Sequence, residues 1–208
     1  MRTLSSTQLD RIRRKISSSQ VYYTDIRAEL TDHIACKIET EIKDEEEFES
    51  LLQKSLVEIN PSKFQRSLLI QSHFSSLKEF LGNLGNLRIM VKTVGMALII
   101  GSFINLFSTY APETAEKALK TAFLIACYGG FVLGLWKNKY LSNSQVLTSA
   151  NVLILIASFS QFFLRLEWLA WTGASHQKLL LFMTACFSFI LCSGYANLFR
   201  KFKNVQWQ

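Results

Sequence analysis

The feature that most constrains the fold is the apolar stretch ALKTAFLIACYGGFVLGLW, residues 118–136, which carries a single charge at Lys120. A helix of these 19 residues rises by about 28 Å, close to the hydrocarbon thickness of a bilayer. Small residues recur within it at every fourth position, at Ala122, Ala126, Gly130 and Gly134. Such a stripe permits close approach of another helix, so we expect a helix–helix contact here, within one molecule or between copies. The stretch predicts a membrane protein.

Three other stretches also have the length and composition of membrane spans. The four predicted spans are residues 93–110, 118–136, 146–164 and 179–199. The connections 111–117 and 137–145 are short, which places consecutive spans side by side and antiparallel. The predicted fold is therefore all-α: an integral membrane four-helix up-down bundle over residues 93–208, preceded by a small N-terminal cytoplasmic helical domain.

The charges are distributed unevenly along the chain. Residues 1–86 contain 12 Lys or Arg and 13 Asp or Glu, whereas residues 87–208 contain 11 and 3. The basic excess lies beside the apolar stretches, where it sets membrane orientation, and this argues against nucleic-acid binding. Arg88, Lys92, Lys137, Lys139, Arg200, Lys201 and Lys203 would lie on one side, and Lys117, Lys120, Arg165 and Lys178 on the other. The positive-inside rule then predicts that both termini are cytoplasmic.

The polar N-terminal part reads as three short amphipathic helices over residues 1–62. Ser5 or Ser6 can cap the first, Thr24 can cap the second, and Asn60-Pro61 can end the third. Their expected common core contains Leu30, Ile34, Phe48, Leu52 and Leu56. Residues 63–92 are predicted to be a linker helix with a hinge, since Gly82-Asn83 and Gly85-Asn86 interrupt its pattern.

The second of these helices carries a motif: VYYTDIRAELTDHI, residues 21–34, contains Arg27, Glu29, Asp32 and His33. It resembles the R-x-E-[LM]-x-D-H-[IV] signature of uncharacterised Bacteroidota multi-pass membrane proteins, and is similar to the permease prefix domain. The resemblance implies a short helical domain ahead of several spans in the bacterial inner membrane, often encoded near PadR-type regulators. It brings no catalytic or ligand-binding residues with it.

Glu29, His33 and Cys36 share one face of that helix, so they could form part of a metal site. The alternative is that His33 lies at the edge of the core and pairs with Glu29 or Asp32. We favour this alternative, because no other polar stretch supplies a clear further ligand. No metal, cofactor or catalytic site is therefore predicted.

The predicted spans contain amide side chains at Asn105, Asn151, Gln161 and Asn197 but no carboxylate near their middle. The amides could line a polar path, or they could form hydrogen bonds between helices, which we favour. A proton-coupled transporter would place an ionisable group mid-span, and HExxH, GxSxG and P-loop motifs are absent from the sequence. These observations argue against an enzyme and against such a transporter.

The predicted function is therefore that of an interaction or regulatory module in the lipid bilayer, with a cytoplasmic helical adapter that binds a protein partner or self-associates. The alternative is an oligomeric membrane effector that perturbs the bilayer or forms a pore.

Overall fold

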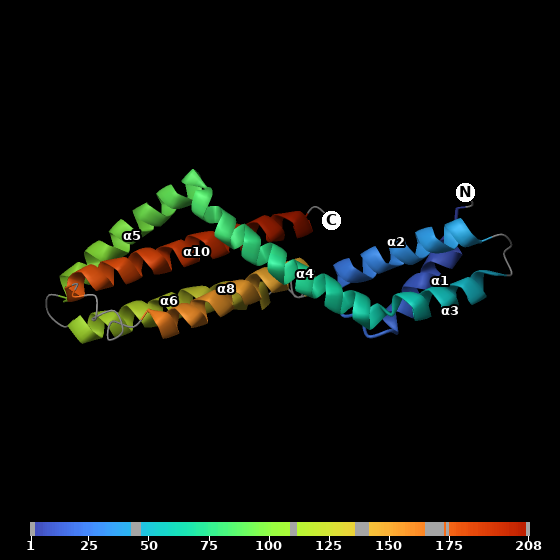
Figure 1. The fold of residues 1–208 in the computed structure, drawn as a ribbon, viewed down its shortest axis with the longest axis horizontal. Helices are drawn as coiled ribbons and strands as arrows, with labels where there is room; N and C mark the ends of the chain where they lie inside the picture. Colours follow the sequence, from blue (N-terminus) through green and yellow to red (C-terminus); the bar gives the residue numbers. More distant parts are fainter. Residues whose placement is uncertain are drawn as a thin grey trace. The chain divides into compact units, whose positions relative to one another are not determined.

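The computed structural model describes residues 3–42, 47–108, 112–135, 142–164, 173 and 175–206, and its regular elements in these ranges are all helices (Figure 1). The helices form two compact units. The first unit is Met1–Ser72 with Ser142–Gln145, and the second is His73–Leu141 with Val146–Gln208. The all-α class predicted from the sequence is confirmed.

The first unit contains α1 (Ser6–Ser17), α2 (Thr24–Glu41), α3 (Phe48–Ile59) and the first part of α4 (Pro61–Gly82). A capping box starts α1: the Ser5 hydroxyl accepts from the Gln8 amide, and the Gln8 side chain accepts from the Ser5 amide. Asn60 ends α3 with a left-handed φ of 48°, and its side chain then accepts from the Lys63 amide at the start of α4. Pro61 suits the first position of α4, where no amide hydrogen is needed.

The core of the first unit joins all four helices. Its buried members are Ile12, Ile16, Val21, Ile26, Leu30, Ile34, Ala35, Ile38, Phe48 and Leu52. Of the five expected core residues, Leu30, Ile34, Phe48 and Leu52 are buried, and Leu56 packs half-buried against them. Phe64, Leu68 and Leu69 of α4 pack on the same core, which is why this unit continues past residue 62, the expected end of the N-terminal domain.

Ion pairs connect the outer surfaces of α2 and α3. Lys37 pairs with Glu58, and Lys54 pairs with Glu41 at 3.5 Å. The hydrogen bond to Glu58 raises the pKa of Lys37, and the same bond lowers the pKa of Glu58. Both pairs are solvent-exposed in part, so their contribution to stability is small.

The second unit contains the end of α4, a 3₁₀ turn η2 (Asn83–Gly85), α5 (Leu87–Ser108), α6 (Pro112–Leu135), α8 (Ser144–Phe163) from Val146 onward, and α10 (His176–Gln206). The turn η2 lies where the glycines and asparagines predicted a hinge. Residues 112–117, expected in a connection, are helical in α6. Acidic residues near the start of α6 stabilise the N-terminal end of a helix. The span prediction did not consider this effect.

Among the described residues, three helices are long and apolar enough to cross a membrane, over Leu87–Leu106, Ser144–Phe163 and His176–Asn204. They correspond to the first, third and fourth predicted spans, with starts two to six residues earlier than expected. The second predicted span falls on α6 and continues to Trp136, which lies outside the described residues. The four-span bundle therefore stays a prediction.

The core of the second unit is built around α10, which lies alongside α5 (Figure 1). Phe187 of α10 is fully buried and stacks on Phe123 of α6, with ring centroids 4.1 Å apart. Gly194 permits the closest approach, because a Cβ there would lie 2.3 Å from Cδ1 of Leu153 on α8. Helices that pack in a membrane use such contacts in place of hydrophobic exclusion from water.

Candidate functional sites in the two units

At the start of α2, Thr24 and Asp25 hold the segment that leads into α8. The Asp25 carboxylate accepts from the Ser144 amide at 3.0 and 3.2 Å and from the Ser144 hydroxyl at 2.5 Å. The Thr24 amide and hydroxyl both donate to the Ser142 carbonyl, at 2.8 and 3.1 Å. Because Ser144 is the first residue of α8, the carboxylate satisfies an otherwise open amide and places negative charge at the positive end of that helix. We call these contacts the α2 clamp.

The α2 clamp corrects one sequence prediction. Thr24 was expected to cap α2, but Tyr23 occupies the N-cap position and the Thr24 hydroxyl donates to Ser142 instead. The partners are separated by 118 and 119 residues in sequence. Helix-end patterns in the sequence involve neighbouring residues, so they cannot indicate a contact between residues that far apart.

The motif residues of α2 have separate roles. Arg27 fixes the chain ahead of its own helix, since Nε donates to the Val21 carbonyl at 2.7 Å and Nη2 to the Tyr22 carbonyl at 3.2 Å. The His33 ring stacks on Phe64 of α4, with centroids 6.0 Å apart. Asp32 and Glu29 are exposed. Arg27 and Asp32 also line a shallow pocket of about 300 Å³ with Arg13, Ser17, Ala28 and Thr31.

The possible metal face does not assemble a site in the described part of the chain. Glu29, His33 and Cys36 are all exposed. Among the described residues, no group of three or more His, Cys, Asp or Glu side chains is placed to hold a metal ion. The stacking of His33 on Phe64 fits a residue at the core edge, although the contact differs from the expected pairing with Glu29 or Asp32.

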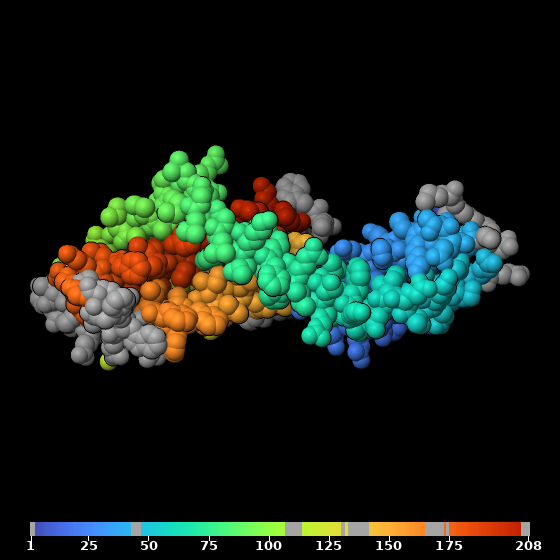
Figure 2. All heavy atoms as spheres, viewed as in Figure 1, coloured from blue at the N-terminus to red at the C-terminus, as the bar shows by residue number. Residues whose placement is uncertain are grey.

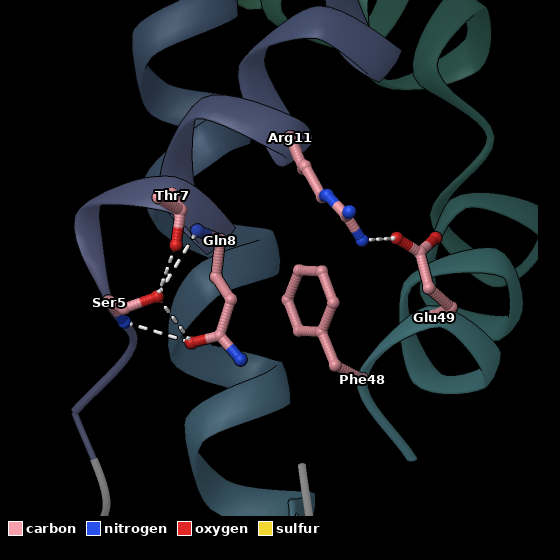
Figure 3. A pocket seen from close by; sticks show the side chains of 6 residues that line it. All are labelled: Ser5, Thr7, Gln8, Arg11, Phe48 and Glu49. Carbon is pink, nitrogen blue, oxygen red and sulfur yellow. Dashed lines mark hydrogen bonds and ion pairs between the residues drawn. The ribbon is translucent and has the colours of Figure 1, made fainter. Parts of the chain in front are cut away.

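Another shallow pocket of about 310 Å³ lies between α1 and α3, lined by Ser5, Thr7, Gln8, Arg11, Phe48 and Glu49 (Figure 3). Arg11 donates to Glu49 across it at 2.5 Å. The Ser5 hydroxyl lies 2.9 Å from the Thr7 hydroxyl and takes part in the capping box with Gln8. These polar groups are thus bonded to one another, and the role they support is helix capping and helix pairing.

The second unit contains a buried polar contact between the end of α4 and α10. The Asn83 amide group donates to the Ser193 hydroxyl at 2.9 Å and to Oδ1 of Asn197 at 3.1 Å. The Ser193 hydroxyl in turn donates to the Phe80 carbonyl at 3.0 Å. Asn83, Ser193 and Asn197 are each at most 4% exposed, so these bonds replace contacts with water.

The contact extends from Asn83 toward the N-terminal side of α4. Toward the N-terminal side of α4, the Ser76 hydroxyl lies 3.1 Å from the Ser149 hydroxyl of α8. Glu79 pairs with Lys201 at 3.0 Å and with Arg200 at 3.8 Å. We call this set the polar ladder; its members are Ser76, Glu79, Asn83, Ser149, Ser193, Asn197, Arg200 and Lys201.

The four amides expected within spans have different environments. Asn197 is buried in the polar ladder and forms hydrogen bonds between helices, the role we favoured for this group. Asn105 and Asn151 are exposed, and Gln161 is half-buried. The buried Nε2 atom of Gln161 has no hydrogen-bond partner among the described residues. Of the other ladder residues, Asn83 was expected only as part of a hinge, and Arg200 and Lys201 only as charges that set orientation. Ser76, Glu79, Ser149 and Ser193 were missed.

The structure does not describe the surroundings of Gly130 and Gly134, so only Ala122 and Ala126 of the small-residue stripe can be assessed. Ala122 is exposed, and Ala126 packs half-buried, with its carbonyl accepting from the Tyr195 hydroxyl. The buried positions of α6 are instead Ala115, Leu119, Phe123 and Cys127. At Ala122 the stripe is therefore exposed in the part of the chain that the structure describes, and a contact between copies stays a prediction.

The α2 clamp and the polar ladder can hold and align helices, because their groups are engaged with one another. Comparisons of the chain with protein-family models, with curated proteins and with solved structures gave no match.

The polar ladder generates a stability prediction. Asn83→Ala removes the donor to Ser193 and Asn197 and leaves the buried Asn197 oxygen without that partner. We expect a loss of about 1–2 kcal/mol, seen as a lower melting temperature of the detergent-solubilised protein. Asn204→Ala, at an exposed position on α10, is the matched control and should melt like the parent. Equal melting of both variants would contradict the assigned role of Asn83.

The α2 clamp generates a local prediction. Asp25→Asn keeps the shape of the side chain but removes the charge at the start of α8, which should cost about 1 kcal/mol of local stability. Hydrogen–deuterium exchange by mass spectrometry should then show roughly fivefold faster exchange in the first turn of α8. Asp32→Asn, at an exposed position of α2, is the control. Unchanged exchange in the Asp25 variant would mean that the clamp does not hold α8.

Proposed function

We propose that the chain is a multi-pass bacterial inner-membrane protein that acts as an interaction or regulatory module, with the N-terminal helical unit as its cytoplasmic adapter. The observation that carries the proposal is the α2 clamp. The first unit includes Ser142–Gln145, and Ser144 begins α8, one of the three helices apolar enough to cross a membrane. An adapter that holds the start of a span can pass a binding event to it.

The coupling follows from where the clamp residues lie. Thr24 and Asp25 are the first two residues of α2, and the same helix contributes Leu30, Ile34 and Ile38 to the core of the first unit. A partner that shifts α2 against α1 or α3 would change the hydrogen bonds at Ser142 and Ser144. Coupling between two sites requires an element that can adopt two arrangements, and in this proposal that element is α2. The resemblance of the α2 motif to permease-prefix-like domains supports an adapter role, with a protein partner or a second copy as the ligand.

The orientation proposed for the module follows from its basic residues. Arg88 and Lys92 lie at the start of α5, and Arg200, Lys201 and Lys203 lie near the end of α10. Together with Lys137 and Lys139 they make seven positive charges against four on the other predicted side. This asymmetry supports cytoplasmic termini.

Reporter fusions test that orientation. Fusions after Lys139 and after Gln208 should report the cytoplasm, because the basic residues near these positions favour that side. A fusion within residues 111–117 should report the periplasm. A periplasmic signal from the fusion after Gln208 would contradict the proposed topology.

One observation favours the alternative, an oligomeric membrane effector. Ala122 and Ile125 of α6 are exposed, and Ile125 is 67% exposed. Val132 is also exposed on the same helix, at 54%. Exposed apolar positions of this kind can pack against a second copy in the bilayer. Assembly through α6 would then perturb the bilayer or line a pore.

A membrane-potential dye separates the two functions. Induced expression of a regulatory module should leave the dye signal of the cells unchanged, since no conducting path forms. Depolarisation on induction would favour the effector and overturn the proposal. The same measurement on Ala122→Leu, which adds bulk to the stripe, is the matched control, because it should reduce depolarisation only if copies assemble through α6.

A further inference from the structure

The part of α4 that belongs to the second unit exposes a continuous apolar stripe, which extends into η2. It consists of Phe74, Leu77, Leu81 and Leu84, which are 69, 36, 53 and 56% exposed. Their spacing of three, four and three residues places them along one side of the helix. Figure 2 shows that α4 is open on the face in view. Four large apolar side chains exposed in a row are an interaction surface.

The other exposed side of this half of α4 is polar. Ser75, Lys78 and Gly82 are exposed and follow one another at spacings of three and four residues, so they form a polar strip beside the apolar stripe. The buried side holds Ser76 and Asn83, which are engaged in the polar ladder. The helix is thus fixed to α10 on one side and presents an apolar stripe and a polar strip on the other two.

We propose that the apolar stripe of α4 is inserted into the lipid bilayer, so that residues 73–84 form an interfacial helix. Such helices lie in the plane of the membrane surface, with the apolar side chains among the acyl chains and the polar side chains toward water. The polar strip with Lys78 meets the second requirement. The sequence prediction treated this segment as a linker outside the membrane, and the proposal adds to the module function a membrane contact of its own.

Two observations favour lipid over a second copy as the occupant. The next helix along the chain, α5, also exposes apolar residues near its start, at Leu87, Val91 and Val94, and it is long and apolar enough to cross a membrane with only 17% of that window buried inside the protein. Exposed basic residues accompany the stripe, namely Lys78 on α4 and Arg88 and Lys92 on α5. Positive charge beside an apolar stripe complements the anionic headgroups of a bilayer.

The experiment places an environment-sensitive label on the stripe. Cys36, Cys127, Cys186 and Cys192 are first replaced by alanine or serine, and Leu77→Cys and Leu81→Cys are then labelled singly with an NBD fluorophore. Leu98→Cys on α5 is the matched control for a lipid-facing position, and Lys54→Cys on α3 is the control for water. The full chain is reconstituted in vesicles of phosphatidylcholine and phosphatidylglycerol, with or without brominated acyl chains.

We expect the labels at positions 77 and 81 to behave like the label at position 98. Their emission should shift to shorter wavelength, and brominated lipid should reduce their intensity. The label at position 54 should show neither change. Since Leu77 and Leu81 are exposed, a label at either position leaves the core of the protein intact.

Two results would overturn the inference. Labels at positions 77 and 81 that behave like the one at position 54 would place the stripe in water. Blue-shifted labels that escape bromine quenching but quench one another at high labelling density would assign the stripe to a second copy. The inference rests on the proposed membrane location, and the label at position 98 distinguishes failure of the two. Quenching at position 98 without quenching at positions 77 and 81 refutes the interfacial helix alone. Absence of quenching at position 98 refutes the membrane location as well.

Discussion

Polar groups held away from water need partners inside the protein, and the second unit is arranged around this requirement. Asn83 and Asn197 are almost fully buried, and the Asn83 amide group donates both to Oδ1 of Asn197 and to the Ser193 hydroxyl. The carboxylate of Glu79 is matched by two basic side chains from α10. Since hydrophobic exclusion from water does not hold helices together within lipid, directional bonds and close contacts must do so. The polar ladder supplies the bonds, and Gly194 supplies the close contact.

The first unit meets the same requirement at its helix ends. Ser5 and Gln8 satisfy each other's backbone amides at the start of α1, and Asn60 serves both the end of α3 and the start of α4. Asp25 extends this pattern to the first amide of α8. A carboxylate that accepts from the first amide of a helix contributes to the stability of that helix end. This contact is the physical basis of the adapter role that we propose for the first unit.

The parts of the fold that could be predicted from the sequence have local signals. Ser5 with Gln8, and Asn60 with Pro61, mark helix ends within four residues. The three apolar helices could be recognised because an apolar run of that length is identified by its own residues, without knowledge of what it packs against. Leu30, Ile34 and Leu52 were placed in the core by their helical spacing alone.

The sites could not be predicted, because their partners lie far apart in the sequence. Asn83 reads as a turn residue until Ser193 is known to face it, and Asp25 reads as a favourable charge for its own helix until Ser144 is found beside it. The small-residue stripe shows a related limit. Spacing identifies a face of α6 that another helix could approach, but the stacking of Phe123 on Phe187 shows that a large side chain carries the contact on the neighbouring face.

The separation of the ladder partners has a consequence for biogenesis. Asn83 lies 110 residues before Ser193 and 114 before Asn197, and both partners belong to the last helix. During synthesis the end of α4 leaves the ribosome well before α10 exists, so its buried amide must remain hydrated or temporarily bonded elsewhere until the final helix arrives. The polar ladder of the second unit can therefore form only after α10 has been made. A chain truncated before residue 193 would lack both of these partners, so the Asn83 side chain would stay hydrated and could not be buried without loss of its hydrogen bonds.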